Sequence, residues 1–127
     1  MKIYRGYKFR MYPNKDQEGL INKTIGSCRF IYNYFLDKKV SNAYSGIKLI
    51  PSLIKEKTFL KEVDKFVLQN SLKDLKSSYN NFFIDIKKDF KSKKGFNKPK
   101  YVSKKNTYQS FRTNYTNNNI EILSKHI

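Results

Sequence analysis

The chain has 127 residues, of which 27 are Lys or Arg and 10 are Asp or Glu, so its formal net charge is +17. This length fits one domain with a real core and excludes a multidomain enzyme. Charge of one sign at this density usually persists where phosphates neutralise it, which points to nucleic acid as the partner. An AT-rich coding sequence, a solvated basic surface and an anionic membrane are the other interpretations, although codon bias does not explain the shortage of acids.

The low cysteine and histidine content excludes further classes of function. Cys28 is the only cysteine and His126 the only histidine, so an internal disulfide and an ordinary zinc site are excluded, and no cofactor is expected. Helical spacing places Cys28 on an apolar face with Ile25, Ile31 and Phe35, which favours core packing over a nucleophile. Because no apolar run approaches about eighteen residues, neither a membrane span nor a signal peptide is expected, and the chain is predicted to be cytoplasmic.

The first predicted element is a strand. Residues 3–12 alternate, with a basic face, and Pro13 ends the run. Asn14 then has the position of a helix N-cap, and Gln17 stands three residues later as in a capping box. A helix is therefore predicted to begin here, with apolar positions at Ile21, Ile25, Cys28, Ile31 and Phe35.

Two poor helix formers, Gly26 and Ser27, interrupt this helical pattern. They allow one kinked helix or two helices joined by a tight turn, and the pair favours two. Residues 42–51 contain Ser45, Gly46 and Pro51 without a sustained period, so they are predicted to be a connector.

The clearest predicted element is a helix that begins near Asp64, a plausible N-cap, with Phe59 and Leu60 leading into it. Its apolar residues recur in steps of four and three, and lysines occupy the opposite face. The apolar positions are Leu68, Leu72, Leu75, Tyr79, Phe82 and Ile86, and the lysines are Lys73, Lys76 and Lys87.

The last part of the chain is predicted to be a basic loop followed by strands. Residues 87–105 are rich in Lys and are broken by Gly95 and Pro99. The predicted strands are 108–113 and 120–123, with a turn at 117–119 and a second turn at 124–125. A strand that begins after this second turn would stop at once and leave its neighbour as an unpaired edge.

Several short motifs resemble the amino-terminal region of the OrfB/TnpB transposases of insertion sequences, and they occur in that family's order and spacing. They lie at residues 7–14 (YKFRMYPN), 26–33 (GSCRFIYN), 59–64 (FLKEVD), 68–75 (LQNSLKDL), 81–83 (NFF), 95–96, 103–105, 110–113 (SFRT) and 117–120. Each motif alone is weak, but this many in one order is a strong signal.

The resemblance implies an α+β fold, in which one N-terminal strand plus a C-terminal β-hairpin form a partial β-barrel with an inserted bundle of amphipathic helices. The corresponding parts are residues 1–13 as the first barrel strand, 14–94 as the helical recognition insertion, and 95–127 as a basic loop and incomplete barrel strands. Family members are RNA-guided DNA endonucleases related to type V CRISPR effectors. Their RuvC-like nuclease and zinc ribbon follow this region, so residues 1–127 are expected to form a single truncated, non-catalytic unit.

The resemblance also assigns sites. Residues matching those that read a short DNA motif are Lys65, Phe66, Gln69, Thr116 and Asn117, whose side chains suit AT-rich base edges. Candidates for contacts to nucleic-acid backbones are Arg5, Lys8, Arg10, Arg29, Lys100, Lys104, Lys105 and Arg112. For Gln69 and Asn117, a helix-surface amide and a turn residue are the structural alternatives, and any of the cations could simply be solvated.

Two functions remain open at this point. In the first, the chain is a nucleic-acid-binding fragment of a TnpB-like protein that meets DNA, guide RNA and a separate chain carrying the nuclease half, but no membrane. In the second, it is a self-standing regulator of a mobile element that binds DNA through a helix-turn-helix at Asn14 to Leu36. A complete small enzyme is excluded for want of paired acids, a usable histidine and a metal cluster.

Overall fold

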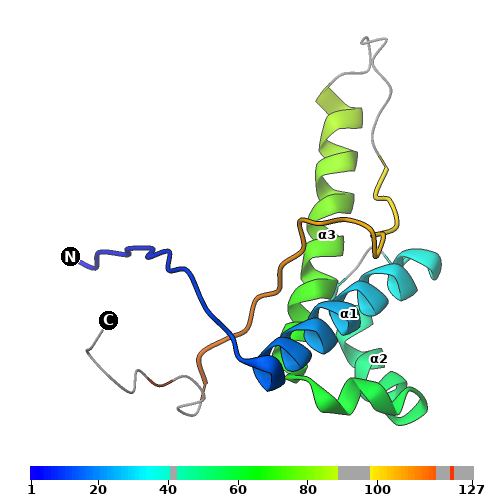
Figure 1. Ribbon diagram of the computed structural model, residues 1–127. Coiled ribbons are helices and arrows are strands. Elements are labelled where there is room, and N and C mark those ends of the chain that lie inside the picture. The colour runs from blue at the N-terminus through cyan, green and yellow to red at the C-terminus, as the bar shows by residue number, and fades with distance from the viewer. Residues whose placement is uncertain (41–42, 89–97, 117–120, 122–127) are drawn as a thin grey trace.

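The computed structural model describes residues 1–40, 43–88, 98–116 and 121, and this part of the chain folds as a small helical bundle (Figure 1). The elements are α1 (Lys15–Asp37), α2 (Ala43–Glu56), a 3-10 helix η1 (Thr58–Glu62) and α3 (Lys65–Lys88). Helix α3 packs most extensively against α1 and also against α2, while η1 contacts both α1 and α2. The helical half therefore provides the core on which the rest of the chain is arranged.

Helix α1 begins with the predicted capping box and runs without interruption. The Asn14 side chain accepts a hydrogen bond from the Gln17 amide at 2.9 Å, and the Gln17 side chain accepts one from the Asn14 amide at 3.0 Å. The predicted break at Gly26 and Ser27 is wrong, because residues 15–37 form one helix. Ser27 is buried within it, so a small side chain there serves packing and does not end the helix.

A left-handed residue ends α1. Lys39 has φ 56°, and the Val40 and Lys39 amides donate to the carbonyl oxygens of Phe35 and Leu36, both at 3.0 Å. This is the Schellman pattern, and Val40 completes it by packing against the core. The helix-turn-helix predicted at Asn14 to Leu36 is wrong in its placement, since these residues lie in one continuous helix and its cap.

The predicted connector at 42–51 is largely helical. Residues 43–56 form α2 despite Gly46 and Pro51 inside it. Ile50 and Leu53 are buried in the core cluster, and Ile47 and Ile54 pack against it. Burial of this apolar stripe outweighs the low helix propensity of glycine and proline, because tertiary packing supplies most helical stability in proteins.

Helix α3 follows its predicted pattern. The Asp64 carboxylate accepts a hydrogen bond from the Phe66 amide at 3.2 Å, as expected of an N-cap. Leu68, Leu72 and Leu75 are fully buried with Ile31 and Phe35 of α1, whereas the apolar residues of the second half of α3 are only partly covered. The core is therefore concentrated in the first three turns of α3.

The predicted α+β fold with a partial β-barrel is wrong for the described residues, which contain three α-helices and no strand. Residues 1–13 are extended and exposed, and residues 108–113 are also extended but pair with no second strand (Figure 1). Alternating side chains produce a strand only where a second strand completes the hydrogen bonds. The predicted strand at 120–123 and the turns at 117–119 and 124–125 lie wholly or almost wholly outside the described residues. Among the described helices, none is long and apolar enough to cross a bilayer.

Candidate nucleic-acid interface

Residues 98–116, here called the strap, run back along the helices and are fastened to them by polar contacts (Figure 1). Near its start, the Asn33 Nδ2 donates to the Val102 carbonyl oxygen at 3.0 Å, and the Val102 amide donates to Asn33 Oδ1 at 2.8 Å. The Tyr101 hydroxyl donates to the Asp37 carboxylate at 3.1 Å, and this bond raises the pKa of Tyr101. The end of α1 thus holds the start of the strap.

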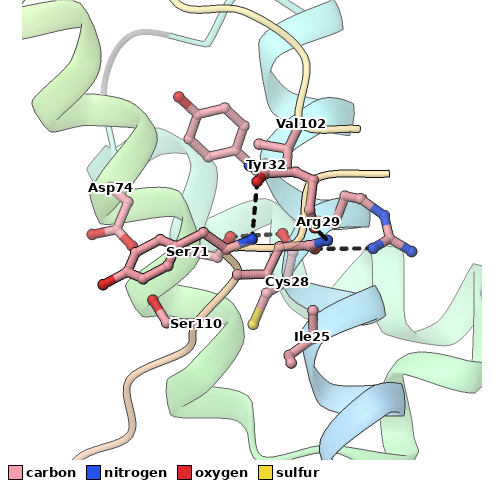
Figure 2. Close-up of a pocket in the computed structure, with 11 residues that line it drawn as sticks. Ile25, Cys28, Arg29, Tyr32, Ser71, Asp74, Val102 and Ser110 are labelled. Atoms are coloured by element: carbon pink, nitrogen blue, oxygen red, sulfur yellow. Dashed lines mark hydrogen bonds between the residues drawn. The ribbon is translucent and has the colours of Figure 1, made fainter. Parts of the chain in front are cut away.

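A pocket of about 220 Å³ lies between α1, α3 and the strap, and Figure 2 shows Cys28 in its wall. Burial, reinforced by the nearby Asp74 carboxylate, raises the pKa of the Cys28 thiol to about 12. The Cys28 sulfur lies 3.8 Å from the Val67 carbonyl oxygen, and the Ser71 hydroxyl donates to the Cys28 carbonyl oxygen at 2.7 Å. A thiol with this pKa is unreactive at neutral pH, so Cys28 is not a nucleophile.

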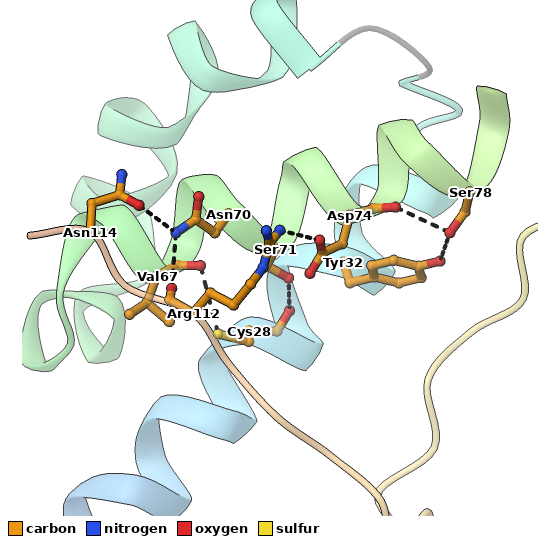
Figure 3. Close-up of polar contacts among 9 residues, drawn as sticks. All are labelled: Cys28, Tyr32, Val67, Asn70, Ser71, Asp74, Ser78, Arg112 and Asn114. Atoms are coloured by element: carbon orange, nitrogen blue, oxygen red, sulfur yellow. Dashed lines mark hydrogen bonds and ion pairs between the residues drawn. The ribbon is translucent and has the colours of Figure 1, made fainter. Parts of the chain in front are cut away.

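The far end of the strap is fastened to α3 (Figure 3). The Asn70 Nδ2 donates to the Arg112 carbonyl oxygen at 3.0 Å and to Asn114 Oδ1 at 3.2 Å. The Arg112 guanidinium also forms an ion pair with Asp74. Both side chains of this ion pair are more than half exposed, so it is weak, and the Asn70 hydrogen bonds contribute more to holding this part of the strap.

A second, larger pocket of about 710 Å³ opens between α1 and the strap, and it is here called the basic pocket. Three cations from distant parts of the sequence line it, together with amide side chains and a hydroxyl, and no carboxylate is among its lining residues. The cations are Lys23, Arg29 and Lys104, and the amides are Asn22, Asn106 and Gln109. Amides and cations without a carboxylate form a site for an anion.

The strap orients the guanidinium of Arg29 in this pocket. Arg29 Nη1 donates to Gln109 Oε1 at 3.0 Å, and Gln109 Nε2 donates to the Asn106 carbonyl oxygen at 2.6 Å. Lys23 also pairs with Glu62 at 3.3 Å, but both side chains are more than half exposed, so this pair is weak. A phosphate could therefore recruit all three cations, with Arg29 already held in place.

The predicted motif-reading residues lie near the start of α3. Lys65, Phe66 and Gln69 share its first turns, and the Lys65 ammonium lies 5.4 Å from the centre of the Phe66 ring. The Thr113 hydroxyl hydrogen-bonds the Asp64 carboxylate, which brings the end of the strap, with a half-buried Thr116, to the same end of α3. Asn117 lies outside the described residues. The role of all five residues in reading DNA stays a prediction.

The predicted backbone-contact residues fall into four groups. One is the exposed extended segment with Arg5, Lys8 and Arg10, and another is the exposed strap cations Lys100 and Lys105. Arg29 and Lys104 meet in the basic pocket, and Arg112 is paired internally as described above.

Sequence reasoning missed several residues of the pocket. Lys23, Asn106 and Gln109 become neighbours of Arg29 only because the strap folds back over α1. The spacing of Asn22, Gly26, Arg29 and Asn33 along one helical face was the one available signal, because steps of three and four share a face.

Comparison with known proteins gives a consistent picture. Residues 1–48 match the family model HTH_OrfB_IS605, described as a helix-turn-helix domain. "Putative RNA-guided DNA endonuclease InsQ" of Escherichia coli (strain K12) is 35% identical over 94 residues, or 65% of this chain and 23% of that protein. A "Putative RNA-guided DNA endonuclease" of Streptomyces pristinaespiralis is 30% identical over 106 residues, or 73% of this chain and 26% of its own length. The chain thus spans about a quarter of the length of these curated relatives.

Proposed function

Because this chain carries the amino-terminal helix-turn-helix region of the OrfB/TnpB family, we propose that it binds nucleic acid and does not itself cleave it. The observation that carries the proposal is the basic pocket, in which Lys23, Arg29 and Lys104 converge without a carboxylate in the lining. Such a group of donors fits the oxygens of a phosphodiester backbone. Binding of the backbone is favourable because neutralising each phosphate releases condensed counterions.

The surrounding segments extend this basic surface. Residues 1–13 contain four Lys or Arg and residues 98–116 contain five, and neither segment contains Asp or Glu. Several acids of the helical half are engaged in holding the fold, as Asp37, Asp64 and Asp74 are by the strap. Apart from Arg112, which pairs with Asp74, the lysines and arginines of these segments are not engaged by these acids and are available to phosphates.

In the proposed mode of binding, phosphate contacts position the strand and a few side chains read a short motif. Lys65, Phe66 and Gln69 on α3, with Thr116 and Asn117, are the proposed motif readers. The proposal further includes a guide RNA, a nuclease part supplied by additional sequence or by a separate chain, and a cytoplasmic site of action. The guide RNA and the nuclease part follow from the names of the relatives as RNA-guided DNA endonucleases, and sequencing of co-purified RNA and DNA tests the guide.

The test of binding uses fluorescence anisotropy with labelled duplex DNA, single-stranded DNA and RNA. Affinity is expected to fall steeply between about 50 and 200 mM salt, with a slope of about 0.9 per phosphate neutralised on duplex DNA and about 0.7 on single strands. With added divalent metal the strands are expected to remain intact. No binding at the lower salt concentration would overturn the proposal, and metal-dependent cleavage by the purified chain would overturn its second part.

A self-standing DNA-binding regulator is the alternative, and the match of residues 1–48 to a family model described as a helix-turn-helix domain favours it. It predicts an oligomer in solution and discrete protected sites in a footprinting experiment, because such regulators bind paired half-sites. A monomer with uniform, salt-sensitive protection supports the proposed fragment function.

A further inference from the structure

An aromatic pocket adjoins the basic pocket on the same side of α1. It has a volume of about 530 Å³ and is lined by Gly26, Arg29, Phe30, Asn33, Tyr34 and Phe59. Arg29 lines both pockets, so its side chain is the wall between a cationic space and an aromatic one.

The aromatic rings form an open platform. The Phe30 and Phe59 rings meet edge to face with centroids 5.2 Å apart, and Phe30 stacks on Tyr34 at 5.8 Å. Phe30 and Tyr34 also pack against the core, whereas Phe59 on η1 is 45% exposed. The inner rings are therefore held firmly while Phe59 presents surface to a ligand.

Glycine at position 26 keeps the pocket open. A Cβ atom built there would lie 3.7 Å from Arg29 Nη2, so a methyl group would fit and a larger side chain would fill the space beside the guanidinium. The other guanidinium nitrogen, Nη1, is held by Gln109 at the basic pocket. Arg29 is thus positioned to face a phosphate on one side and a planar group on the other.

We propose that these two pockets form one nucleotide subsite for single-stranded nucleic acid, with an unpaired base in the aromatic pocket and its phosphate in the basic pocket. This rests on the proposed function and deepens it. A base inside a duplex has no free face for a protein ring, so stacking here requires an unpaired strand. Arg29 serves both halves, since a guanidinium binds phosphate and also packs against aromatic faces.

The test compares a labelled single-stranded oligonucleotide with the same backbone carrying abasic sites, in RNA and DNA forms, with duplex DNA as a third ligand. The intact strand is expected to bind at least about fivefold more tightly than the abasic strand. Gly26→Leu is expected to abolish this difference, while the variant still binds the abasic strand and the duplex with a steep salt dependence. An unfolded variant would lose binding of the abasic strand and the duplex as well, so unfolding cannot account for such a result.

Matched variants separate the two halves of the subsite. Gly19→Leu makes the same change at an open position of α1 outside both pockets and is expected to behave as wild type. Arg29→Gln is expected to weaken both strands and lower the salt slope by about 0.7, whereas Lys76→Gln on the exposed face of α3 removes the same charge with little effect.

The outcomes distinguish this subsite from the function on which it rests. If Gly26→Leu keeps the preference for intact bases, or wild type has none, the subsite is wrong although nucleic-acid binding stands. If wild type binds none of the ligands, the proposed function itself fails. A preference for the RNA or the DNA form identifies the source of the strand, and in either case the preference for bases must be lost in Gly26→Leu.

Discussion

The side-chain amide of Asn33 pairs with the backbone of Val102 as a neighbouring strand would, donating to its carbonyl oxygen and accepting from its amide. The two residues are separated by 69 positions. A helix side chain thus satisfies both backbone groups of an extended segment. This explains how the strap is held on the bundle although no strand lies beside it in the described structure.

Asn33→Ala is expected to release the start of the strap without harming α1. The change removes two hydrogen bonds, each with a net worth of about 0.5–1.5 kcal/mol, while Ala favours the helix. Hydrogen exchange at the Val102 amide should accelerate at least about tenfold, with helical circular dichroism unchanged. Asn22→Ala, at an exposed amide of the same helix, is the control and should leave this exchange rate unaltered.

Lys39→Gly is expected to stabilise the fold by about 0.5–1 kcal/mol. Lys39 has φ 56°, where a side chain is strained and glycine is not. The adjacent Lys38 is right-handed with φ −76°, so Lys38→Gly should instead lower the free energy of unfolding. Urea denaturation of both variants measures the difference, and equal effects would contradict the assigned role of the turn.

Gly46→Ala is expected to destabilise the bundle by about 1–3 kcal/mol. A Cβ atom at this position of α2 would lie 2.4 Å from Leu72 Cδ2 and 3.2 Å from Leu72 Cγ, so the side chain of Leu72, which is buried in the core, must shift. Gly19→Ala has open space and should stabilise α1 by about 0.5–1 kcal/mol. Thermal unfolding would refute the close approach of α2 to α3 if both changes raised the melting temperature.

Cys28 is expected to resist alkylation in the native protein. Burial raises the pKa of its thiol from 9.0 to about 12, so at pH 8 the thiolate is about a thousandfold rarer than in the unfolded chain. Reaction with iodoacetamide should therefore be slow in buffer and fast in denaturant. A native rate close to the denatured rate would show that the thiol is accessible.

The raised pKa of the Cys28 thiol is expected to make the folded protein less stable at high pH. Because the folded pKa is the higher one, the neutral thiol contributes stability that is complete below pH 9 and is lost as pH rises toward 12. Comparing Cys28→Ala with wild type over this range isolates the contribution from that of the lysines and tyrosines. The wild-type curve should fall more steeply.

The capping box at Asn14 and Gln17 and the core positions of α3 were predictable because they depend on local spacing. Apolar residues three and four apart share a helical face whatever lies beyond it. The continuity of α1 through Gly26 and Ser27, and the helix over residues 43–56, were not predictable from propensity. Burial against α3 outweighs the local preference in both cases.

For the candidate site, too, some features could be predicted from the sequence and others could not. The sequence alone determined the excess of positive charge, the shortage of metal ligands and the family motifs, since these depend only on which residues are present and in what order. The tertiary structure alone decided that Arg29 meets Lys104 and Gln109, and that Phe59 approaches Phe30. Such neighbours come from segments that are far apart in the sequence and pack together only on folding. The local periodicity of apolar residues does not indicate which segments will pack together.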